Sequence, residues 1–393
     1  MKLSFSVKCL AAAALAVAVT APTFAQQPVR IGYAIARTGP WAAGAQVTQE
    51  PNYIMWAEQL NASGGLNVKG VKRKIELIGI DDRSDTETVV RSYEKLMGSD
   101  KVDLILPPWS TGANFAMMPL AQKYGYPILA PTATGRKLLG MKNPYFFALL
   151  QQPDRMMDAL AEYMVARSAK TAAVLYVDEL FGLEQLDGLE TSLKAKGIQI
   201  VEKKSYPLGV KDLQPALNDI KAKSPDAFVA LSYPPDTFLI TGQSRAIGFN
   251  PKLFYTAVGT AFPVYRDKFG KVAEGVMGLG TWNPRTSPAA KEYFDAHVKR
   301  WQKEPDRWAS AHAWAGLQIL QVAVEKVGLD RKAIRDYIAN NEFDTIIGKI
   351  RFKNGENVTT PGVVSQWQGG EFEVVWPPER STSPALYPKQ PWK

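Results

Sequence analysis

The stretch VDLILPPWSTGANFAMMPLAQKYGYPILAPTAT, residues 102–134, decides the fold class. It opens with a short apolar run, Val102 to Leu106, of the length typical of a buried strand. Asn114 to Lys123 follows with the length and mixed polarity of a helix, and Pro127 to Ala130 is a second short apolar run. Strand, helix and strand in this order predict two parallel strands joined by a helical crossover.

The same alternation of short apolar runs and longer amphipathic stretches extends over most of the chain. A first series covers residues 29–130, and a second restarts at Met156 and reaches Gly248. Two such series predict an α/β protein of two lobes, each with a parallel sheet that helices cover on both faces. The further strands expected are 29–35, 74–80, 172–176, 198–206 and 227–231, and the further helices are 48–60, 87–97, 156–167, 183–196, 213–222 and 237–248.

After Trp282 the pattern changes to long helices, then to strands bordered by glycines and a proline-rich tail. The sequence has no short-period repeat and no low-complexity tract, so a repeat architecture is not expected. We expect helices at 289–301, 309–327 and 331–340 and strands at 347–352, 362–367 and 372–375.

The first 25 residues have the layout of a secretory signal peptide. Lys2 and Lys8 supply positive charge, Cys9 to Ala21 is almost entirely apolar, and Thr23-Phe24-Ala25 ends in a small residue. The apolar run is shorter than the roughly 20 residues that span a bilayer, which disfavours the alternative of a membrane anchor. We therefore expect cleavage after Ala25 and export to the periplasm.

Cysteine content and charge exclude several classes of protein. The only cysteine, Cys9, lies in the predicted leader, so the mature chain would hold no disulfide, thiolate metal site or cysteine nucleophile. Removing Lys2 and Lys8 lowers Lys+Arg from 47 to 45 against 38 acidic residues, and the net charge falls from +9 to +7. The basic residues are scattered and form no stripe interleaved with aromatic residues, so we expect no nucleic-acid binding.

The residues that carry enzymatic chemistry are sparse. Both histidines, His297 and His312, fit structural positions in predicted helices, and neither belongs to a His/Asp/Glu cluster at metal-ligand spacing. No Gly-x-Ser-x-Gly motif precedes a helix, Gly278-x-Gly280 lacks the third glycine of a dinucleotide site, and Asp81-Asp82 fits the end of a strand. We expect no enzyme, no metal and no cofactor.

Several short segments, in a fixed order along the chain, resemble those of a known family. They are Ile31-Gly32, Thr38-Gly39-Pro40, LNASGGL at 60–66, the strand at 75–82, Asp100-Lys101-Val102, Trp109-Ser110-Thr111, PILAPTAT at 127–134, AEGV at 273–276 and AHAWA at 311–315. In their order and spacing the chain resembles the leucine/isoleucine/valine-binding family, the type I periplasmic substrate-binding proteins of ABC transporters.

The resemblance implies two doubly wound parallel-sheet lobes joined by three hinge crossovers, with solute bound in the cleft between them. Residues 26–148 and 282–355 would form the first lobe, which accounts for the late helices. Residues 149–281 and 356–393 would form the second lobe. Movement at the crossovers would close the lobes on the solute.

The resemblance also assigns a carboxylate clamp to the first lobe. Ser110 and Thr111 match the loop after the third strand, and Thr132, Ala133 and Thr134 match the segment after the next strand. Hydroxyls and helix-starting N–H groups suit an anion because several donors are held toward one point. The alternative is that Ser110 and Thr134 only cap the helices that follow.

Four aromatic residues follow strands rather than lying on amphipathic helix faces, and we expect them to contact the ligand. Trp41 and Trp109 would face the cleft from the first lobe, and Phe181 and Tyr233 from the second. Aromatic residues are more often part of the core, which is the alternative for each of them.

Val258 is the departure that bears on the ligand. Relatives that bind α-amino acids often have an acid at this position to pair the ligand ammonium, and a buried ammonium without a partner is costly. Either Asp236 or Glu179 takes its place, or the ligand has no ammonium. The apolar and aromatic candidates favour an aromatic or branched carboxylate.

The sequence thus predicts a monomeric periplasmic receptor that delivers a small carboxylate-bearing solute to the permease subunits of an ABC importer. One alternative is a receptor for branched-chain or other amino acids in the same transporter class. Another is a receptor that presents its ligand to a membrane sensor. An amidase-type regulator shares the fold but would lack the leader.

Overall fold

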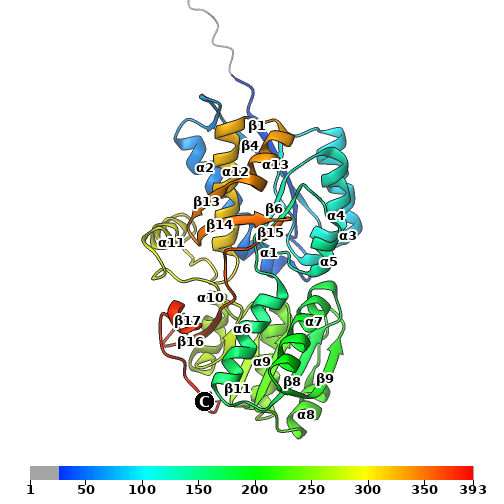
Figure 1. Ribbon diagram of the computed structural model, residues 1–393, viewed down its shortest axis with the longest axis vertical. Helices are drawn as coiled ribbons and strands as arrows, with labels where there is room; N and C mark the ends of the chain where they lie inside the picture. Colours follow the sequence, from blue (N-terminus) through cyan, green and yellow to red (C-terminus); the bar gives the residue numbers. More distant parts are fainter. Residues whose placement is uncertain (1–25, 393) are drawn as a thin grey trace, which may run out of the picture.

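The computed structural model describes residues 26–392 and has two lobes stacked along its long axis (Figure 1). Each lobe has a largely parallel sheet covered by helices, as the alternating sequence pattern predicts. The predicted signal peptide, residues 1–25, lies outside the described residues. Among residues 26–392 no helix is both long and apolar enough to cross a membrane.

The first lobe is built from two groups of strands. In one, β1 lies between β4 and β5 with parallel pairing on both sides, and nearly all of its residues are buried. In the other, β6, β7 and β15 are parallel and β14 and β13 continue the sheet in antiparallel pairing. The strands are β1 (Val29–Ile35), β4 (Ile75–Asp81), β5 (Leu104–Ile105), β6 (Ile128–Ala130), β7 (Phe146–Ala148), β13 (Glu342–Thr345), β14 (Gly348–Lys353) and β15 (Glu356–Asn357), with a separate hairpin of β2 (Leu66–Val68) and β3 (Val71–Arg73).

Helices from two distant parts of the chain cover this lobe. The late helices lie beside the early ones, and α12 contacts both α2 and β6. The helices are α1 (Ala42–Thr48), α2 (Glu50–Ala62), α3 (Thr86–Glu94), a π turn (Lys95–Ser99), α4 (Thr111–Tyr124), α5 (Arg136–Gly140), α11 (Pro288–Trp301), α12 (Ser310–Val327) and α13 (Arg331–Asn340). α4 begins three residues before the predicted start because Ser110 caps it.

The second lobe has one sheet in the order β17-β16-β12-β11-β10-β8-β9. β8 to β12 pair in parallel, and β16 and β17 close one edge in antiparallel pairing. The strands are β8 (Thr171–Val177), β9 (Gln199–Tyr206), β10 (Ala227–Leu231), β11 (Leu253–Thr256), β12 (Met277–Gly278), β16 (Val364–Gln368) and β17 (Glu371–Trp376). The helices are α6 (Pro153–Ala166), α7 (Leu180–Ala195), α8 (Gln214–Ala222), α9 (Pro234–Ala246) and α10 (Pro263–Phe269), with 3₁₀ turns at Gly270–Ala273 and Pro378–Arg380.

Three connections join the lobes: β7 to α6, β12 to α11, and β15 to β16. The predicted fold class, two doubly wound lobes with three crossovers, is therefore confirmed. The proline-rich tail stays with the second lobe, where Trp392 Nε1 donates to the Phe249 carbonyl at 2.7 Å. The residue limits predicted for the lobes, 26–148 with 282–355 and 149–281 with 356–393, remain a proposal.

Candidate functional site

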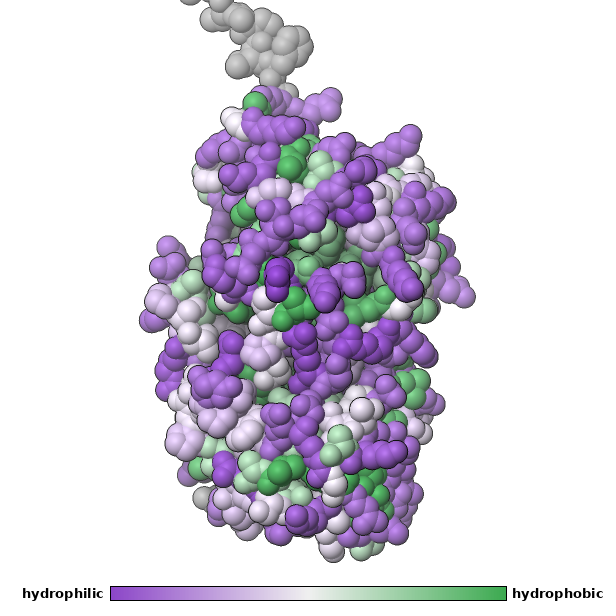
Figure 2. Space-filling view, in the orientation of Figure 1, coloured by the Kyte–Doolittle hydropathy of each residue, from purple (hydrophilic) through white to green (hydrophobic). Residues whose placement is uncertain are grey.

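The carboxyl ends of the central strands of both lobes face one another, which is where open α/β sheets bind ligands. The segments that follow β5 and β6 in the first lobe oppose those that follow β8, β10 and β11 in the second. The two lobes touch on the face drawn in Figure 2. The ten residues predicted to bind ligand all lie in these segments or beside them, and none is more than 3% exposed: Trp41, Trp109, Ser110, Thr111, Thr132, Ala133, Thr134, Phe181, Tyr233 and Val258.

An aromatic cluster bridges the lobes. The ring of Trp109 lies 5.4 Å from that of Tyr233 between centroids, and Phe181 stacks on Tyr233 at 5.0 Å with an interplanar angle of 24°. Trp308 approaches Trp109 edge-on at 6.3 Å. The sequence prediction did not include Trp308, because it precedes a helix rather than following a strand. Its position beside Trp109 depends on the second crossover, from β12 to α11, which returns the chain to the first lobe.

Trp109 is held from within the first lobe. Its Nε1 donates to Thr48 Oγ1 at 2.9 Å. Its ring covers Gly44, where a Cβ atom would lie 2.1 Å from Trp109 Cζ2, so only glycine fits. Trp41 is the N-cap residue of α1, the helix that contains Gly44 and Thr48. It is also buried, but its Nε1 has no hydrogen-bond partner among residues 26–392.

Ser110 has a backbone conformation that non-glycine residues rarely adopt, with φ +81° and ψ 154°. It caps α4, since its Oγ accepts from the Ala113 N–H at 3.1 Å. Ser110 therefore does cap its helix, whereas Thr134 does not, because the N-cap residue of α5 is Gly135. A serine hydroxyl can donate as well as accept. Within the described part of the chain the Ser110 hydroxyl has no acceptor for its proton, which leaves it available to an anion.

The three threonines of the predicted clamp differ from Ser110 because they donate within the protein. Thr132 Oγ1 donates to Gln49 Oε1 and Thr134 Oγ1 to the Gln151 carbonyl, both at 2.7 Å. Thr111 Oγ1 donates to the Thr134 carbonyl at 3.3 Å. These bonds fix the shape of the first lobe's side of the cleft, which we call the first wall; the side of the second lobe is the second wall. The threonine protons are not free for a ligand.

The wall of the second lobe contains Glu179 and Tyr233. Burial raises the pKa of Glu179, and the nearby Tyr233 hydroxyl partly opposes this shift. Burial and the charge of Glu179 hold the pKa of Tyr233 well above its usual range. Glu179 Oε2 and Tyr233 Oη are both inaccessible, and neither makes a hydrogen bond of normal geometry within residues 26–392.

Asp236 and Val258 belong to the same lobe as this pair. Burial raises the pKa of Asp236 to about 6, although the Tyr233 backbone N–H and the Tyr206 hydroxyl act against it. Tyr206 Oη donates to Asp236 Oδ2 at 3.4 Å. Val258 is fully buried and bonds through its backbone, where its N–H donates to the Ser232 carbonyl at 3.0 Å. Asp236 thus accepts a hydrogen bond from Tyr206, whereas Glu179 Oε2 accepts none of normal geometry within residues 26–392.

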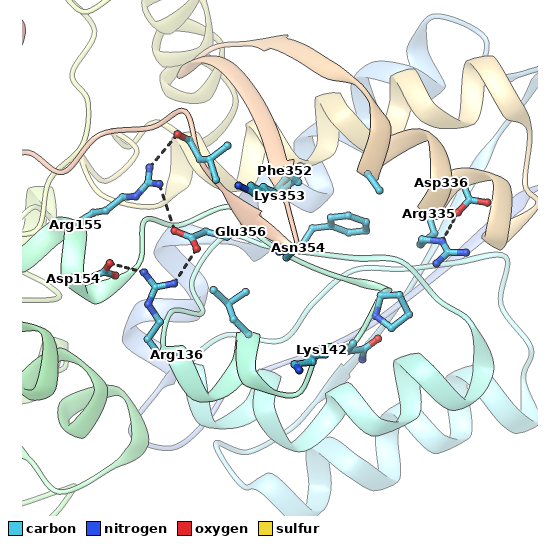
Figure 3. A pocket seen from close by; sticks show the side chains of 17 residues that line it. Arg136, Lys142, Asp154, Arg155, Arg335, Asp336, Phe352, Lys353, Asn354 and Glu356 are labelled. Atoms are coloured by element: carbon cyan, nitrogen blue, oxygen red, sulfur yellow. Dashed lines mark hydrogen bonds and ion pairs between the residues drawn. The ribbon is translucent and has the colours of Figure 1, made fainter.

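A large hollow lies elsewhere, on the hinge side of the first lobe. It has a volume of about 990 Å³ and is lined by α5, α13, the β14–β15 turn and the start of α6 (Figure 3). At one end Arg136 pairs with Asp154 at 2.5 Å and with Glu356 at 2.9 Å, and Arg155 approaches Glu356 at 3.6 Å. We call these four residues the hinge ion cluster. It joins α5 of the first lobe to α6 of the second.

The histidines occupy buried structural positions. Burial lowers the pKa of both His297 and His312 to about 4, so both are neutral near pH 7. In the region that the structure describes, no group of three or more His, Cys, Asp or Glu side chains could hold a metal ion.

Comparisons with known proteins agree with this architecture. The family model described as periplasmic binding protein matches residues 28–371. Leu/Ile/Val-binding protein homolog 7 of Brucella abortus is 25% identical over 353 residues, covering 84% of this chain and 87% of the relative.

Two solved structures have the same fold. The branched-chain amino acid transporter substrate-binding protein LivJ of Streptococcus pneumoniae, in complex with isoleucine, has a TM-score of 0.78 at 22% identity and covers 89% of this chain and all of its own. A solute-binding protein of an ABC transporter from R. palustris, in complex with benzoate, has a TM-score of 0.80 at 18% identity, over 92% and 98% of the two chains. The chain belongs to the periplasmic binding protein family, whose members bind substrates and are not enzymes.

Proposed function

We propose that the protein is a periplasmic receptor that captures a small carboxylate with an aromatic or branched body and delivers it to an ABC importer. The observation that carries the proposal is the Ser110 hydroxyl. It caps α4, retains a free proton, and stands next to Trp109 in the aromatic cluster between the lobes. The group that would bind the carboxylate and the aromatic cluster that would bind the apolar body are thus adjacent.

The start of α4 suits a carboxylate. The N–H groups of a helix's first turn have no partner inside the helix, and the helix dipole favours a negative charge there. In α4 the Ala113 N–H is used by the Ser110 cap, and those of Thr111 and Gly112 precede it. A carboxylate at this point would accept from the Ser110 hydroxyl and from these two N–H groups.

The aromatic cluster supports an apolar ligand body. Trp109, Phe181 and Tyr233 provide ring faces from both lobes. Offset or edge-on aromatic contacts are worth about 0.5–1.5 kcal/mol beyond the area they bury. Benzoate and isoleucine, the ligands named for the two solved structures above, share a carboxylate joined to an apolar body.

An amino acid is the second candidate ligand, and one observation favours it. Glu179 provides a buried carboxylate in the second wall even though Val258 supplies none. We further propose a periplasmic location after cleavage of the leader, a monomeric state, and permease subunits as the membrane partner. The alternative is that the protein presents the bound solute to a membrane sensor.

Calorimetry with a panel of aromatic acids, branched aliphatic acids and amino acids tests the proposal. Ser110→Ala should weaken the best ligand by about 10- to 100-fold, because a hydrogen bond to a charged group contributes roughly 1.5–3 kcal/mol. Ser287→Ala is the matched control, because Ser287 caps α11 in the same way at 3.0 Å. It should lower stability by a similar amount, about 1 kcal/mol, without changing affinity. Unchanged binding in Ser110→Ala would refute the clamp.

A further inference from the structure

Two polar atoms in the second wall are buried without a hydrogen bond in the described chain, Glu179 Oε2 and Tyr233 Oη. Leaving a buried polar group unpaired costs about 1–3 kcal/mol, and more when the group is charged. Such a pair is therefore expected to have a partner in the functional state. Both atoms belong to residues at the interface of the two lobes.

Glu179 and Tyr233 have no structural task that explains their polar groups. Each is the residue before a helix, Glu179 before α7 and Tyr233 before α9, yet neither side chain caps its helix. Asp236 differs because Tyr206 donates to it. The unpaired acid is thus Glu179, which stands two residues before Phe181 of the aromatic cluster.

The position of this acid relative to the clamp defines the two ends of a ligand. Ser110 and Trp109 are neighbours in the first wall, Trp109 contacts Tyr233 across the cleft, and Tyr233 influences the pKa of Glu179. The free donor of the first wall and the free acceptors of the second therefore belong to opposite sides of one aromatic cluster.

We infer that the solute carries a hydrogen-bond donor, an ammonium or a hydroxyl group, and that Glu179 and Tyr233 form the subsite that receives it. The inference rests on the proposed function, in that the solute binds by its carboxylate at Ser110. It assigns recognition of the donor to Glu179, at the end of β8, rather than to the position of Val258, at the end of β11.

The subsite also couples binding to closure. When the lobes close without a solute, Glu179 Oε2 and Tyr233 Oη lose water and gain only a contact with each other that falls short of normal hydrogen-bond geometry. A solute that supplies a donor removes this cost, and therefore favours the closed state more than a carboxylate of the same shape without a donor. A ligand shifts a conformational equilibrium only by its differential affinity for the two states.

The test is calorimetry with matched acids that differ in one donor. Suitable pairs are leucine and 4-methylpentanoate, phenylalanine and 3-phenylpropanoate, and 4-hydroxybenzoate and benzoate. In at least one pair we expect the member with the donor to bind about 10-fold tighter or more. The first two pairs report an ammonium and the third a hydroxyl.

Glu179→Gln should reduce this preference, and the reduction should be larger for an ammonium because the charge is lost as well as one acceptor. Asp236→Asn, the matched control, should leave the preference unchanged. Tyr233→Phe is a second variant that removes the hydroxyl without changing the ring. Thermal unfolding of each variant checks that it folds.

The outcomes separate the two proposals. If carboxylates bind and Ser110→Ala weakens them, but donors bring no preference or Glu179→Gln leaves the preference intact, this inference fails and the proposed function stands. If no acid of the panel binds, or binding ignores Ser110, both fail.

Discussion

The two walls of the cleft have the same architecture but differ in how their polar groups are paired. In the first wall Trp109, Thr132 and Thr134 each donate to a group of the same lobe or of the adjoining crossover, and Trp41 Nε1 is the exception. In the second wall Glu179 Oε2 and Tyr233 Oη make no hydrogen bond of normal geometry within residues 26–392. The first wall is therefore pre-organised by the fold, whereas the second is completed by what binds. Apart from those at Ser110, substitutions should mainly affect stability in the first wall and affinity in the second.

The largest expected effect tests the first wall. Trp109→Ala removes a fully buried ring that packs on Gly44 and contacts Trp308 and Tyr233. The free energy of unfolding should fall by about 3–5 kcal/mol even without ligand, as for other large-to-small changes in a core. Gly44→Ala should also destabilise, because its new Cβ would collide with the same ring. Denaturant unfolding of the ligand-free protein measures both.

Tyr233→Phe is the counterpart in the second wall. It deletes a hydroxyl that makes no hydrogen bond of normal geometry in the described residues, so ligand-free stability should change by less than about 1 kcal/mol. If Tyr233→Phe and Trp109→Ala destabilise the protein equally, the contrast between the walls is wrong.

An effect of intermediate size concerns the pH dependence of the second wall. Burial raises the pKa of Asp236 to about 6, from an ordinary value of 3.8. The folded state therefore binds this proton more tightly than the unfolded state does, and ionisation destabilises the fold. Relative to Asp236→Asn, the wild type should lose stability as pH rises from about 4 to about 6 and show no further change above that range.

Thermal unfolding of both proteins between pH 4 and 8, with the two curves subtracted, measures this difference. Asp82 and Asp306, whose pKa values burial also raises to about 6, occur in both proteins and cancel. A difference curve that is flat from pH 4 to 6 would show that Asp236 is not destabilised by ionisation.

Much of this architecture could be predicted because it follows from local sequence. Strands of a parallel sheet have their carboxyl ends at one edge, so residues after strands, such as Ser110 and Tyr233, were expected at the cleft. Trp308 could not be found this way, since it precedes α12 and lies beside Trp109 only because the second crossover returns the chain to the first lobe. The choice between Glu179 and Asp236 also needed tertiary contacts, because Tyr206, the partner of Asp236, lies 30 residues away.

The hinge ion cluster was beyond sequence reasoning for the same reason, since Arg136 and Glu356 are 220 residues apart. The cluster bears on the comparison of the two walls because it links the two lobes directly. Arg136 pairs with Asp154, which begins α6 of the second lobe, so opening the cleft would separate charges that closure brings together.

Arg136→Gln should therefore weaken solute binding only slightly, by about twofold to fivefold, because exposed ion pairs contribute roughly 0–1 kcal/mol each. The loss should appear mainly as faster release and should disappear near 1 M salt, where the Debye length is about 3 Å. Lys204→Gln is the matched control, because Lys204 pairs with Asp219 at 2.6 Å inside the second lobe and spans no hinge. Stopped-flow release rates at low and high salt measure both variants. Equal effects of the two substitutions would mean that the cluster stabilises the surface in general and does not hold the two walls together.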